Sequence, residues 1–222
     1  MTVKAIQRVD ELIGNTPLVK LNVAGNANVY GKLEFGNPGG SIKDRVAKEI
    51  IDEALESGKI NKDTVIIEST SGNTGVGLAM IGAAYGLKVI IFMPNTMSVE
   101  RRKLIQAYGA ELRIVDGGVP AANEQAAQLL KDTPNSFAPS QFTNLVNVQA
   151  HYRHTGPEIW QDTDGEIAAF VAGVGISSSP CAHMIVPLPV CTGVEIIFCG
   201  ESCSIANAIT SVFKMRFPSP TS

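Results

Sequence analysis

The sequence predicts an α/β fold in which helices cover both faces of a parallel sheet. Two observations predict it: between residues 64 and 137, short runs of apolar, often β-branched residues alternate with stretches of helical periodicity, and turns rich in Gly, Pro, Ser or Asn separate them. Strands that alternate with helices in this way become parallel neighbours in one sheet. Open sheets of this kind bind ligands beyond the carboxyl ends of their strands, so the loops that follow strands are candidate sites.

The expected elements are, in chain order, a helix over 41–57, a strand over 64–67, a helix over 76–85, a strand over 88–93, a helix over 98–108, a strand over 111–115, a helix over 121–130, a weak strand near Phe137 and a strand over 166–174. Gly86 should end the second helix as its C′ residue, and Pro94 should close the strand that follows. The third helix is expected to turn these charged residues to solvent: Glu100, Arg101, Arg102 and Lys103.

The composition excludes several classes of protein. The 222-residue chain carries 18 Lys and Arg against 21 Asp and Glu, a net charge of −3, which argues against nucleic acid or an anionic membrane as a partner. The first residues form no apolar signal segment, and three prolines break the uncharged stretch 176–194. A cytoplasmic protein without a membrane span is therefore expected. The first 180 residues contain no Cys, so no disulfide framework is expected to hold the whole fold together.

A lysine follows a glycine-rich bend in the segment NPGGSIKDR, residues 37–45. Ser41 and Asp44 have the spacing of a capping box, which predicts that Ser41 is the N-cap of a helix and that Lys43 lies in its first turn. The helix dipole disfavours a cation there and would lower the pKa of the amine, which suits attack on a carbonyl or a Schiff base. Spacing alone leaves an exposed lysine beside two charged neighbours as the alternative.

A second candidate site is the turn STSGNTG, residues 69–75, between an expected strand and an expected helix. Its backbone N–H groups and the hydroxyls of Ser71 and Thr74 could bind a carboxylate or a phosphate. The alternative is a polar loop that caps only its own helix.

No metal site is expected. His151 and His154 are three residues apart with no third ligand nearby, which is more typical of a partly exposed helix face. The spacing of the remaining candidates matches no standard zinc site: Cys181, His183, Cys191, Cys199 and Cys203.

Four segments in the same order resemble cysteine synthase, the O-acetylserine sulfhydrylase of the fold-type II pyridoxal-phosphate enzymes. They are KLEFGNPGGSIKDR (32–45), ESTSGNTGVGLA (68–79), MPNTMSVERRKLIQAYGAEL (93–112) and TGPEIW (155–160). Relatives of the cystathionine synthase and threonine dehydratase types are the alternatives, and the ESTSGNTG and TMSVERR segments favour cysteine synthase.

The resemblance covers about residues 1–175 and implies the three-layer parallel-sheet fold of the tryptophan synthase β-like kind. It implies a nearly complete smaller α/β domain over 36–145 and an incomplete larger, cofactor-binding domain formed by 1–35 plus 146–175.

The resemblance also implies a reaction and its residues. Lys43 would form the Schiff base with pyridoxal 5′-phosphate and remove the α-proton of the substrate, and Asn73, Gly173 and Gly175 would help to hold the cofactor. The substrate carboxylate would be bound by Thr70, Ser71, Gly72, Asn73, Thr74 and Gln141. The implied reaction is a β-replacement in cysteine biosynthesis, in which O-acetylserine and sulfide give cysteine and acetate. A homodimer is a possible assembly.

The sequence departs from this family after Gly175. The family continues with a Gly/Thr-rich phosphate loop, whereas here ISSSP (176–180) follows, and residues 176–222 contain all four Cys but only four charged side chains. We therefore expect a truncated chain with an unrelated tail over 176–222, without a clear continuation of the strand and helix alternation. A non-catalytic remnant that binds a ligand or a partner protein is the alternative function.

Overall fold

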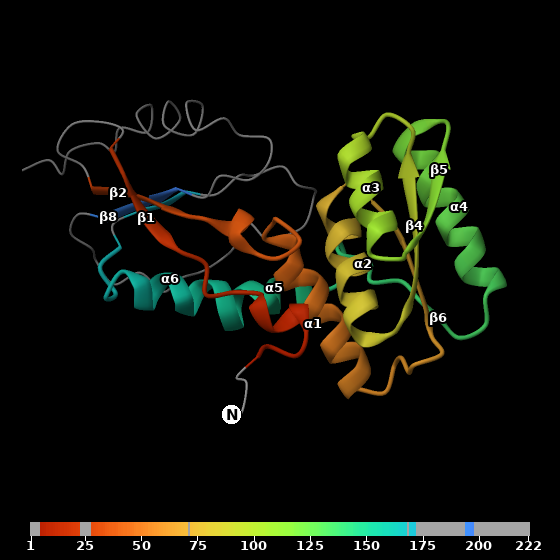
Figure 1. The fold of residues 1–222 in the computed structure, drawn as a ribbon, viewed down its shortest axis with the longest axis horizontal. Coiled ribbons are helices and arrows are strands. Elements are labelled where there is room, and N and C mark those ends of the chain that lie inside the picture. Colours follow the sequence, from red (N-terminus) through yellow and green to blue (C-terminus); the bar gives the residue numbers. More distant parts are fainter. Residues whose placement is uncertain (1–4, 23–27, 71, 168, 172–193, 198–222) are drawn as a thin grey trace, which may run out of the picture. The chain divides into compact units, whose positions relative to one another are not determined.

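The computed structural model describes residues 5–22, 28–70, 72–167, 169–171 and 194–197 (Figure 1). The chain divides into two compact units, one formed by residues 1–15 and 34–155 and the other by residues 16–33 and 156–222. Each unit is considered by itself below.

A four-stranded parallel sheet forms the centre of the first unit. Its strands are β3 (Val65–Ser69), β4 (Lys88–Pro94), β5 (Glu111–Val115) and β6 (Ser136–Phe137), in the order β5-β4-β3-β6. All three pairings are parallel, as expected for strands that alternate with helices.

Helices connect the strands of this sheet. They are α2 (Asn73–Tyr85), α3 (Val99–Ala107) and α4 (Gly118–Asp132), and α1 (Lys43–Glu56) precedes the first strand. Gly86 ends α2 in the left-handed conformation with φ of 70°, and the Ser98 hydroxyl caps α3, so both predicted helix boundaries are confirmed.

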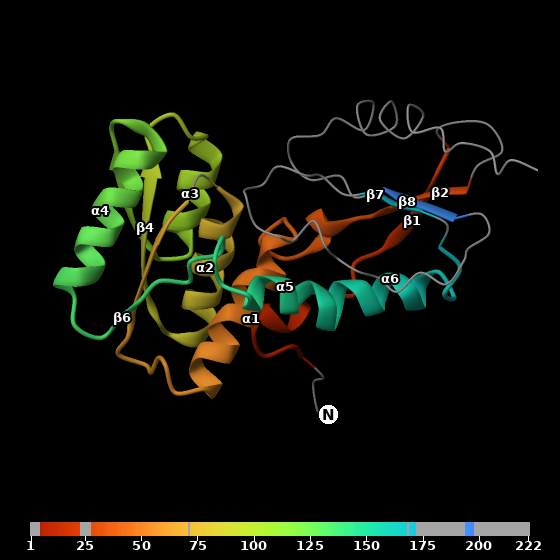
Figure 2. The ribbon, with the colours of Figure 1, turned by 180° about the vertical axis from the view of Figure 1, so that it is seen from behind.

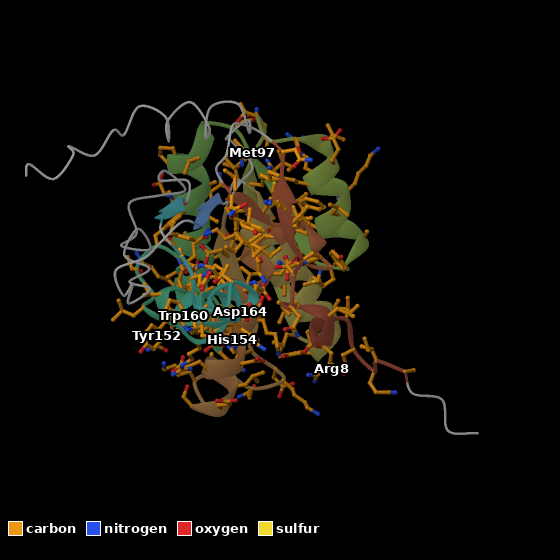
Figure 3. The ribbon with its side chains drawn as sticks, turned by 90° about the vertical axis from the view of Figure 1, so that its left-hand side faces the viewer. Arg8, Met97, Tyr152, His154, Trp160 and Asp164 are labelled. Atoms are coloured by element: carbon orange, nitrogen blue, oxygen red, sulfur yellow. The ribbon has the colours of Figure 1, made fainter. Side chains whose placement is uncertain are left out.

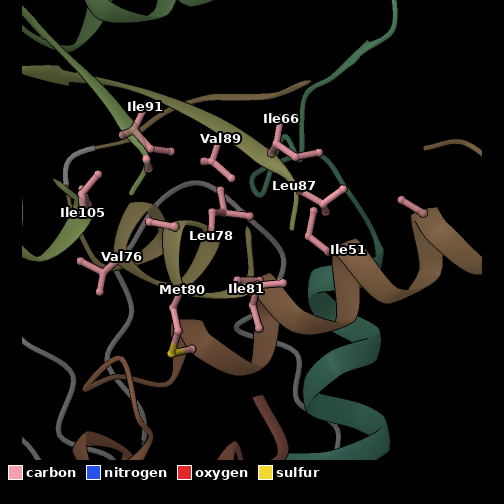
Figure 4. Packing of buried hydrophobic residues seen from close by; sticks show 14 of the residues in the cluster. Ile51, Ile66, Val76, Leu78, Met80, Ile81, Leu87, Val89, Ile91 and Ile105 are labelled. Carbon is pink, nitrogen blue, oxygen red and sulfur yellow. The ribbon is translucent and has the colours of Figure 1, made fainter. Parts of the chain in front are cut away.

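Alternate residues of the strands point to opposite faces of the sheet. Ile66, Val89 and Ile91 belong to a core that also contains residues of α1, α2 and α3, whereas Ile67, Ile90 and Phe92 pack with Ala122 and Ala126 of α4. The two clusters place α4 on the opposite face from α2, as the reverse view also shows (Figure 2). Figure 4 shows the larger cluster from close by. The predicted parallel sheet between two helical layers is therefore confirmed.

Shorter elements complete the first unit. Two 3₁₀ helices, Val9–Leu12 and Glu34–Gly36, lie before α1. Helix α5 (Val146–Ala150) runs into a π-helical turn over His151–Thr155. Val46 and Ile50 of α1 pack with two residues of α5, Val146 and Ala150, which explains why this segment groups with the first unit.

The second unit contains a sheet in the order β1-β2-β8-β7. Strands β1 (Leu18–Leu21) and β2 (Asn28–Lys32) are antiparallel, whereas β8 (Val194–Ile197) is parallel to both β2 and β7 (Ala169–Val171). Strand β8 lies within residues 176–222, where no continuation of the strand and helix alternation was expected, and the rest of that stretch lies outside the described residues. The described part of the strand expected over 166–174 is β7.

A buried ammonium group joins the hairpin of the second unit to helix α6 (Gly156–Asp162). Lys32 Nζ donates to the Thr16 carbonyl at 2.7 Å and lies 2.6 Å from Asp162 Oδ2 and 3.1 Å from Glu158 Oε2. Because a buried ammonium must be paired, this cluster fixes the end of β2 against α6.

In the part of the chain that the structure describes, no helix combines the length and the apolar character needed to cross a membrane.

Candidate functional site

The bend before Lys43 is fixed by the Asn37 side chain. Asn37 Nδ2 donates to the Glu34 carbonyl and to Glu34 Oε2, both at 2.9 Å, and Asn37 Oδ1 accepts the Gly14 N–H at 2.9 Å. Gly40 has φ of +85°, a conformation that side chains other than hydrogen disfavour. The glycine-rich segment is therefore a specific turn whose position depends on a buried amide.

A buried ion pair ties the same turn to helix α1. Arg45 Nε lies 2.7 Å from Glu34 Oε2, and Arg45 Nη2 lies 2.9 Å from Glu34 Oε1. The two side chains are only 2% and 6% exposed. A bidentate pair of this kind defines both distance and orientation, so it sets where α1 begins relative to the bend.

Helix α1 begins at Lys43, one residue later than the capping-box pattern predicts. The helix has Ile42 at its N-cap, and the Ser41 hydroxyl accepts the N–H of Lys43 at 3.1 Å. Asp44 Oδ2 accepts the Gly39 N–H at 2.7 Å. Burial raises the pKa of Asp44 to about 6, and hydrogen bonds from the backbone of Gly39 and Ser41 oppose this rise. Ser41 and Asp44 thus both cap the helix start, and Lys43 lies in the first turn as predicted.

Helices α1 and α2 approach each other closely beside this lysine. A Cβ added to Gly77 would lie 3.1 Å from Ala47 Cβ and 3.2 Å from the Lys43 carbonyl oxygen. A side chain at position 77 would therefore push the helices apart, and glycine here keeps Lys43 next to the first turns of α2.

His151 lies in the electrostatic field of the lysine. Its pKa is lowered to about 4, first by burial and then by the charges of Lys43 and Arg45. His151 Nδ1 also lies 3.1 Å from Thr155 Oγ1. The imidazole is therefore neutral at pH 7, and Lys43 has an uncharged ring as its neighbour.

The expectation of a partly exposed helix face holds for both histidines, because His151 is half-buried and His154 is exposed. His154 is 54% exposed and contacts Glu49 Oε2 at 3.0 Å, and Figure 3 labels it beside the exposed Tyr152. His151 also belongs to the lysine's surroundings, and its position four residues before the TGPEIW segment is a signal that could have indicated this. Within the described ranges, no group of three or more His, Cys, Asp or Glu is arranged to hold a metal ion.

The loop between β3 and α2 continues the sheet and then opens helix α2. The Thr70 N–H donates to the Phe92 carbonyl at 3.0 Å, and Thr70 Oγ1 accepts the Gly72 N–H at 3.3 Å. Helix α2 begins at Asn73. The positive end of its dipole therefore lies at this loop. Ser71 lies outside the described residues, as do the predicted cofactor residues Gly173 and Gly175.

Gln141 and Thr74 meet at this loop although 67 residues separate them in the chain. Thr74 Oγ1 donates to Gln141 Oε1 at 2.6 Å, and the side chains are only 4% and 3% exposed. Asn147 Nδ2 donates to the Gln141 carbonyl at 2.8 Å. Two side chains that the sequence assigned to one carboxylate site are thus in direct contact.

Two further charged residues border the loop, and neither was among the predicted site residues. Glu68 is buried in β3 directly before the loop, and its Oε2 accepts the Ser140 N–H at 2.7 Å. Arg101 Nε donates to Asn73 Oδ1 at 3.2 Å, and a Cβ on Gly72 would lie 3.0 Å from the same Nε. Arg101 therefore packs partly buried against the loop, which corrects its expected position on the solvent side of α3.

The site thus combines an amine, a neutral imidazole and a loop that opens the N-terminus of α2, all within one unit. Lys43 lies at the positive end of α1, next to the first turns of α2. The α2 dipole and the N–H groups of the Gln141 amide favour a carboxylate, and the Thr74 hydroxyl orients that amide by donating to its oxygen. This arrangement suits a small acid that reacts at an amine or at a carbonyl group held by the amine.

Comparison with known proteins supports the same chemistry. The model of the pyridoxal-phosphate dependent enzyme family matches residues 9–184. Cysteine synthase B of Campylobacter jejuni is 52% identical over 174 residues, which are 78% of this chain and 58% of that protein. A cysteine synthase of Staphylococcus aureus is 47% identical over 180 residues, or 79% of this chain and 58% of its own length. The chain therefore spans somewhat over half the length of these relatives.

Solved structures give the same result. A hydrogen sulfide-producing enzyme from Fusobacterium nucleatum superposes with a TM-score of 0.74 at 48% identity, covering 78% of this chain and 58% of its own. Cysteine synthase from Entamoeba histolytica superposes with a TM-score of 0.74 at 41% identity, covering 82% of this chain and 56% of its own. The resemblance to cysteine synthase and the fold-type II architecture are thus confirmed, and the chain belongs to the pyridoxal-phosphate dependent enzyme family.

Proposed function

We propose that the chain carries out the β-replacement of a cysteine synthase in the cytoplasm, converting O-acetylserine and sulfide into cysteine and acetate. The observation that carries this proposal is the close approach of α1 and α2 at Gly77, which keeps Lys43 next to the helix whose first turn contains Asn73 and Thr74. The names of the relatives support the choice of reaction.

The described residues fit one end of the cofactor that this family uses. Lys43 would hold its aldehyde carbon and Asn73 would contact its 3′-oxygen, and the cofactor would supply the electron sink for the reaction. Gly173 and Gly175, which the resemblance assigns to the cofactor, remain part of the proposal.

The substrate carboxylate would bind at the start of α2. Gln141 Oε1 already accepts the Thr74 hydroxyl at 2.6 Å, so the Gln141 Nε2 carries the N–H groups that can donate to a carboxylate. Backbone N–H groups of the loop over residues 70–74 would complete the anion site. This binding would hold the α-carbon of the substrate where the Lys43 amine can remove its proton.

The neutral His151 supports this role of Lys43. A protonated imidazole beside the lysine would add a second positive charge, whereas the ring with its pKa near 4 is uncharged at the working pH. Lys43 is then the stronger base of this pair, and the neutral ring adds no further positive charge beside it.

Borohydride reduction tests the proposal directly. The purified chain is mixed with pyridoxal phosphate, reduced and digested, and the labelled peptide is identified by mass spectrometry; we expect the label on Lys43 and its loss in a Lys43→Arg variant. A label on other lysines only would refute cofactor binding at this site. Turnover of O-acetylserine with sulfide, compared with turnover of serine and of threonine, then separates a cysteine synthase from related activities.

Labelling and turnover together also test the alternative of a non-catalytic remnant, because a remnant would give neither the Lys43 label nor turnover. A homodimer, which the resemblance allows, is part of the proposal and is tested by light scattering of the purified chain.

A further inference from the structure

The carboxyl group of Glu68 is buried under the candidate carboxylate site and is not used by the proposed reaction. Glu68 lies in β3 (Val65–Ser69), directly before the loop over 70–74, and is only 8% exposed. Its Oε2 accepts the Ser140 N–H at 2.7 Å, and its carboxyl group also accepts backbone N–H groups of Ser69 and Gln141. Three backbone donors from two distant segments therefore converge on one side chain.

The segment that Glu68 holds has an unusual backbone conformation. Ser140 has φ of +50°, a left-handed conformation that is uncommon and strained for a residue other than glycine. Its carbonyl accepts the N–H groups of Thr143 and Asn144, both at 2.9 Å. Surrounding contacts must maintain such a turn, and the hydrogen bond from the Ser140 N–H to Glu68 ties it to the central sheet.

The turn at Ser140 sets the position of Gln141. Gln141 follows Ser140 in the chain, and its side-chain amide faces Thr74, with 2.6 Å between Gln141 Oε1 and the Thr74 hydroxyl. Glu68 thus holds the backbone of Gln141 while also preceding the loop that carries Thr74. One carboxyl group connects the two halves of the anion site.

We propose that Glu68 is a positioning residue, which holds Gln141 at the substrate carboxylate site by accepting the backbone N–H groups of residues 140 and 141. This inference rests on the proposed function, because it assigns the carboxylate to that site. Glu68 acts through Gln141, because the Glu68 carboxyl group accepts backbone N–H groups. An apolar side chain would fill the same space but could not accept these N–H groups, which would then be buried without partners.

The test uses the full 222-residue chain loaded with pyridoxal phosphate. Glu68→Gln keeps the size of the side chain but replaces one accepting oxygen by a donating NH₂ group. Without the hydrogen bonds from residues 140 and 141 to the Glu68 carboxyl group, Gln141 should no longer be held at the carboxylate site. We therefore expect a KM for O-acetylserine about 10-fold higher with little change in kcat. Glu53→Gln on the solvent side of α1 is the matched control and should leave both constants unchanged.

A double-mutant cycle separates positioning from a general loss of structure. If Glu68 acts through Gln141, the double variant Glu68→Gln, Gln141→Ala should have the same KM as Gln141→Ala alone. Effects that multiply in the double variant would overturn the proposal, because they would mean that Glu68 acts on binding independently of Gln141.

Amide hydrogen exchange of the same chain provides a readout that does not need activity. In Glu68→Gln we expect the Ser140 and Gln141 amides to exchange at least 10-fold faster, with no such change in Glu53→Gln. Unchanged exchange at both amides would overturn the proposal. A wild-type chain without turnover would refute the proposed function, and the exchange rates would still decide whether Glu68 holds Gln141.

Discussion

Replacing Glu34 by Gln should destabilise the protein far more than the same replacement at the surface. Glu34 accepts hydrogen bonds from Arg45 Nε at 2.7 Å, from Arg45 Nη2 at 2.9 Å and from Asn37 Nδ2 at 2.9 Å. Gln keeps the shape but removes the charge, so the Arg45 guanidinium stays buried without its counter-ion. Breaking a buried pair in this way costs about 3–5 kcal/mol of the free energy of unfolding.

Glu53→Gln is the control of identical chemistry. Glu53 pairs with Lys59, with 2.9 Å between Nζ and Oε1, but the side chains are 32% and 56% exposed. Solvent screens such a pair, so its loss should cost about 0–1 kcal/mol. The two variants should therefore differ by roughly 3 kcal/mol, which corresponds to about 6–12 °C in Tm for a chain of this size.

Urea denaturation followed by far-UV circular dichroism measures both variants against the wild type, and thermal melts provide the second estimate. Because the same cluster holds the bend before Lys43, borohydride labelling of Lys43 in Glu34→Gln should also be weaker. Equal losses of less than about 1 kcal/mol in the two variants would refute the reasoning, since the pair of Glu34 and Arg45 would then behave like a solvent-exposed one.

Three further changes test the surroundings of the site. Gly75→Ala would place a Cβ 2.7 Å from Thr70 Cγ2, so we expect a loss of about 1–3 kcal/mol in urea denaturation and a higher KM for O-acetylserine; a neutral effect would contradict the close contact. Burial raises the pKa of Glu68 from 4.5 to about 7, so the folded chain binds this proton more tightly than the unfolded chain. The stability of the wild type relative to Glu68→Gln should then fall by on the order of 3 kcal/mol as the pH rises from 4.5 to 7, and a constant difference would contradict this. The pKa of His151 is lowered from 6.5 to about 4, so its contribution to stability is present above pH 6.5 and is lost as the pH falls toward 4. An NMR titration, with the ring signals assigned from a His151→Gln variant, should show a neutral imidazole at pH 5, and a midpoint near 6.5 would refute this.

The central sheet could be predicted from the sequence because its strands are buried on both faces. Strand β4 is a continuous apolar run, and such a run needs helices on both sides of it. The hairpin of β1 and β2 was missed, because β1 is partly or fully exposed along its length and β2 mixes buried with exposed positions. Strand β8 was missed for another reason: it is only four residues long and lies in a segment without the alternation of strands and helices that identified the other strands.

Local patterns located the parts of the site that depend on nearby residues. The spacing of Ser41 and Asp44 predicted Lys43 in a first helical turn, and the Ser41 hydroxyl accepts the Lys43 N–H although the helix begins one residue later than predicted. The pairing of Glu68 with Ser140 joins positions 72 residues apart, and the neutral state of His151 depends on burial and on charges from α1. No short-range pattern encodes such contacts.

The described part of the site lies within a single unit. Experiments can therefore distinguish a defect in this unit from a defect in cofactor binding. Lys43, Thr74, Gln141 and His151 all belong to residues 34–155, and so does Glu68. The proposed binding of the substrate carboxylate therefore depends on contacts inside one unit, whereas cofactor binding involves, by resemblance, Gly173 and Gly175 outside the described residues. The two functions can fail independently, so a chain that binds a carboxylate but gives no label at Lys43 would have its defect in cofactor binding rather than in the fold around α1 and α2.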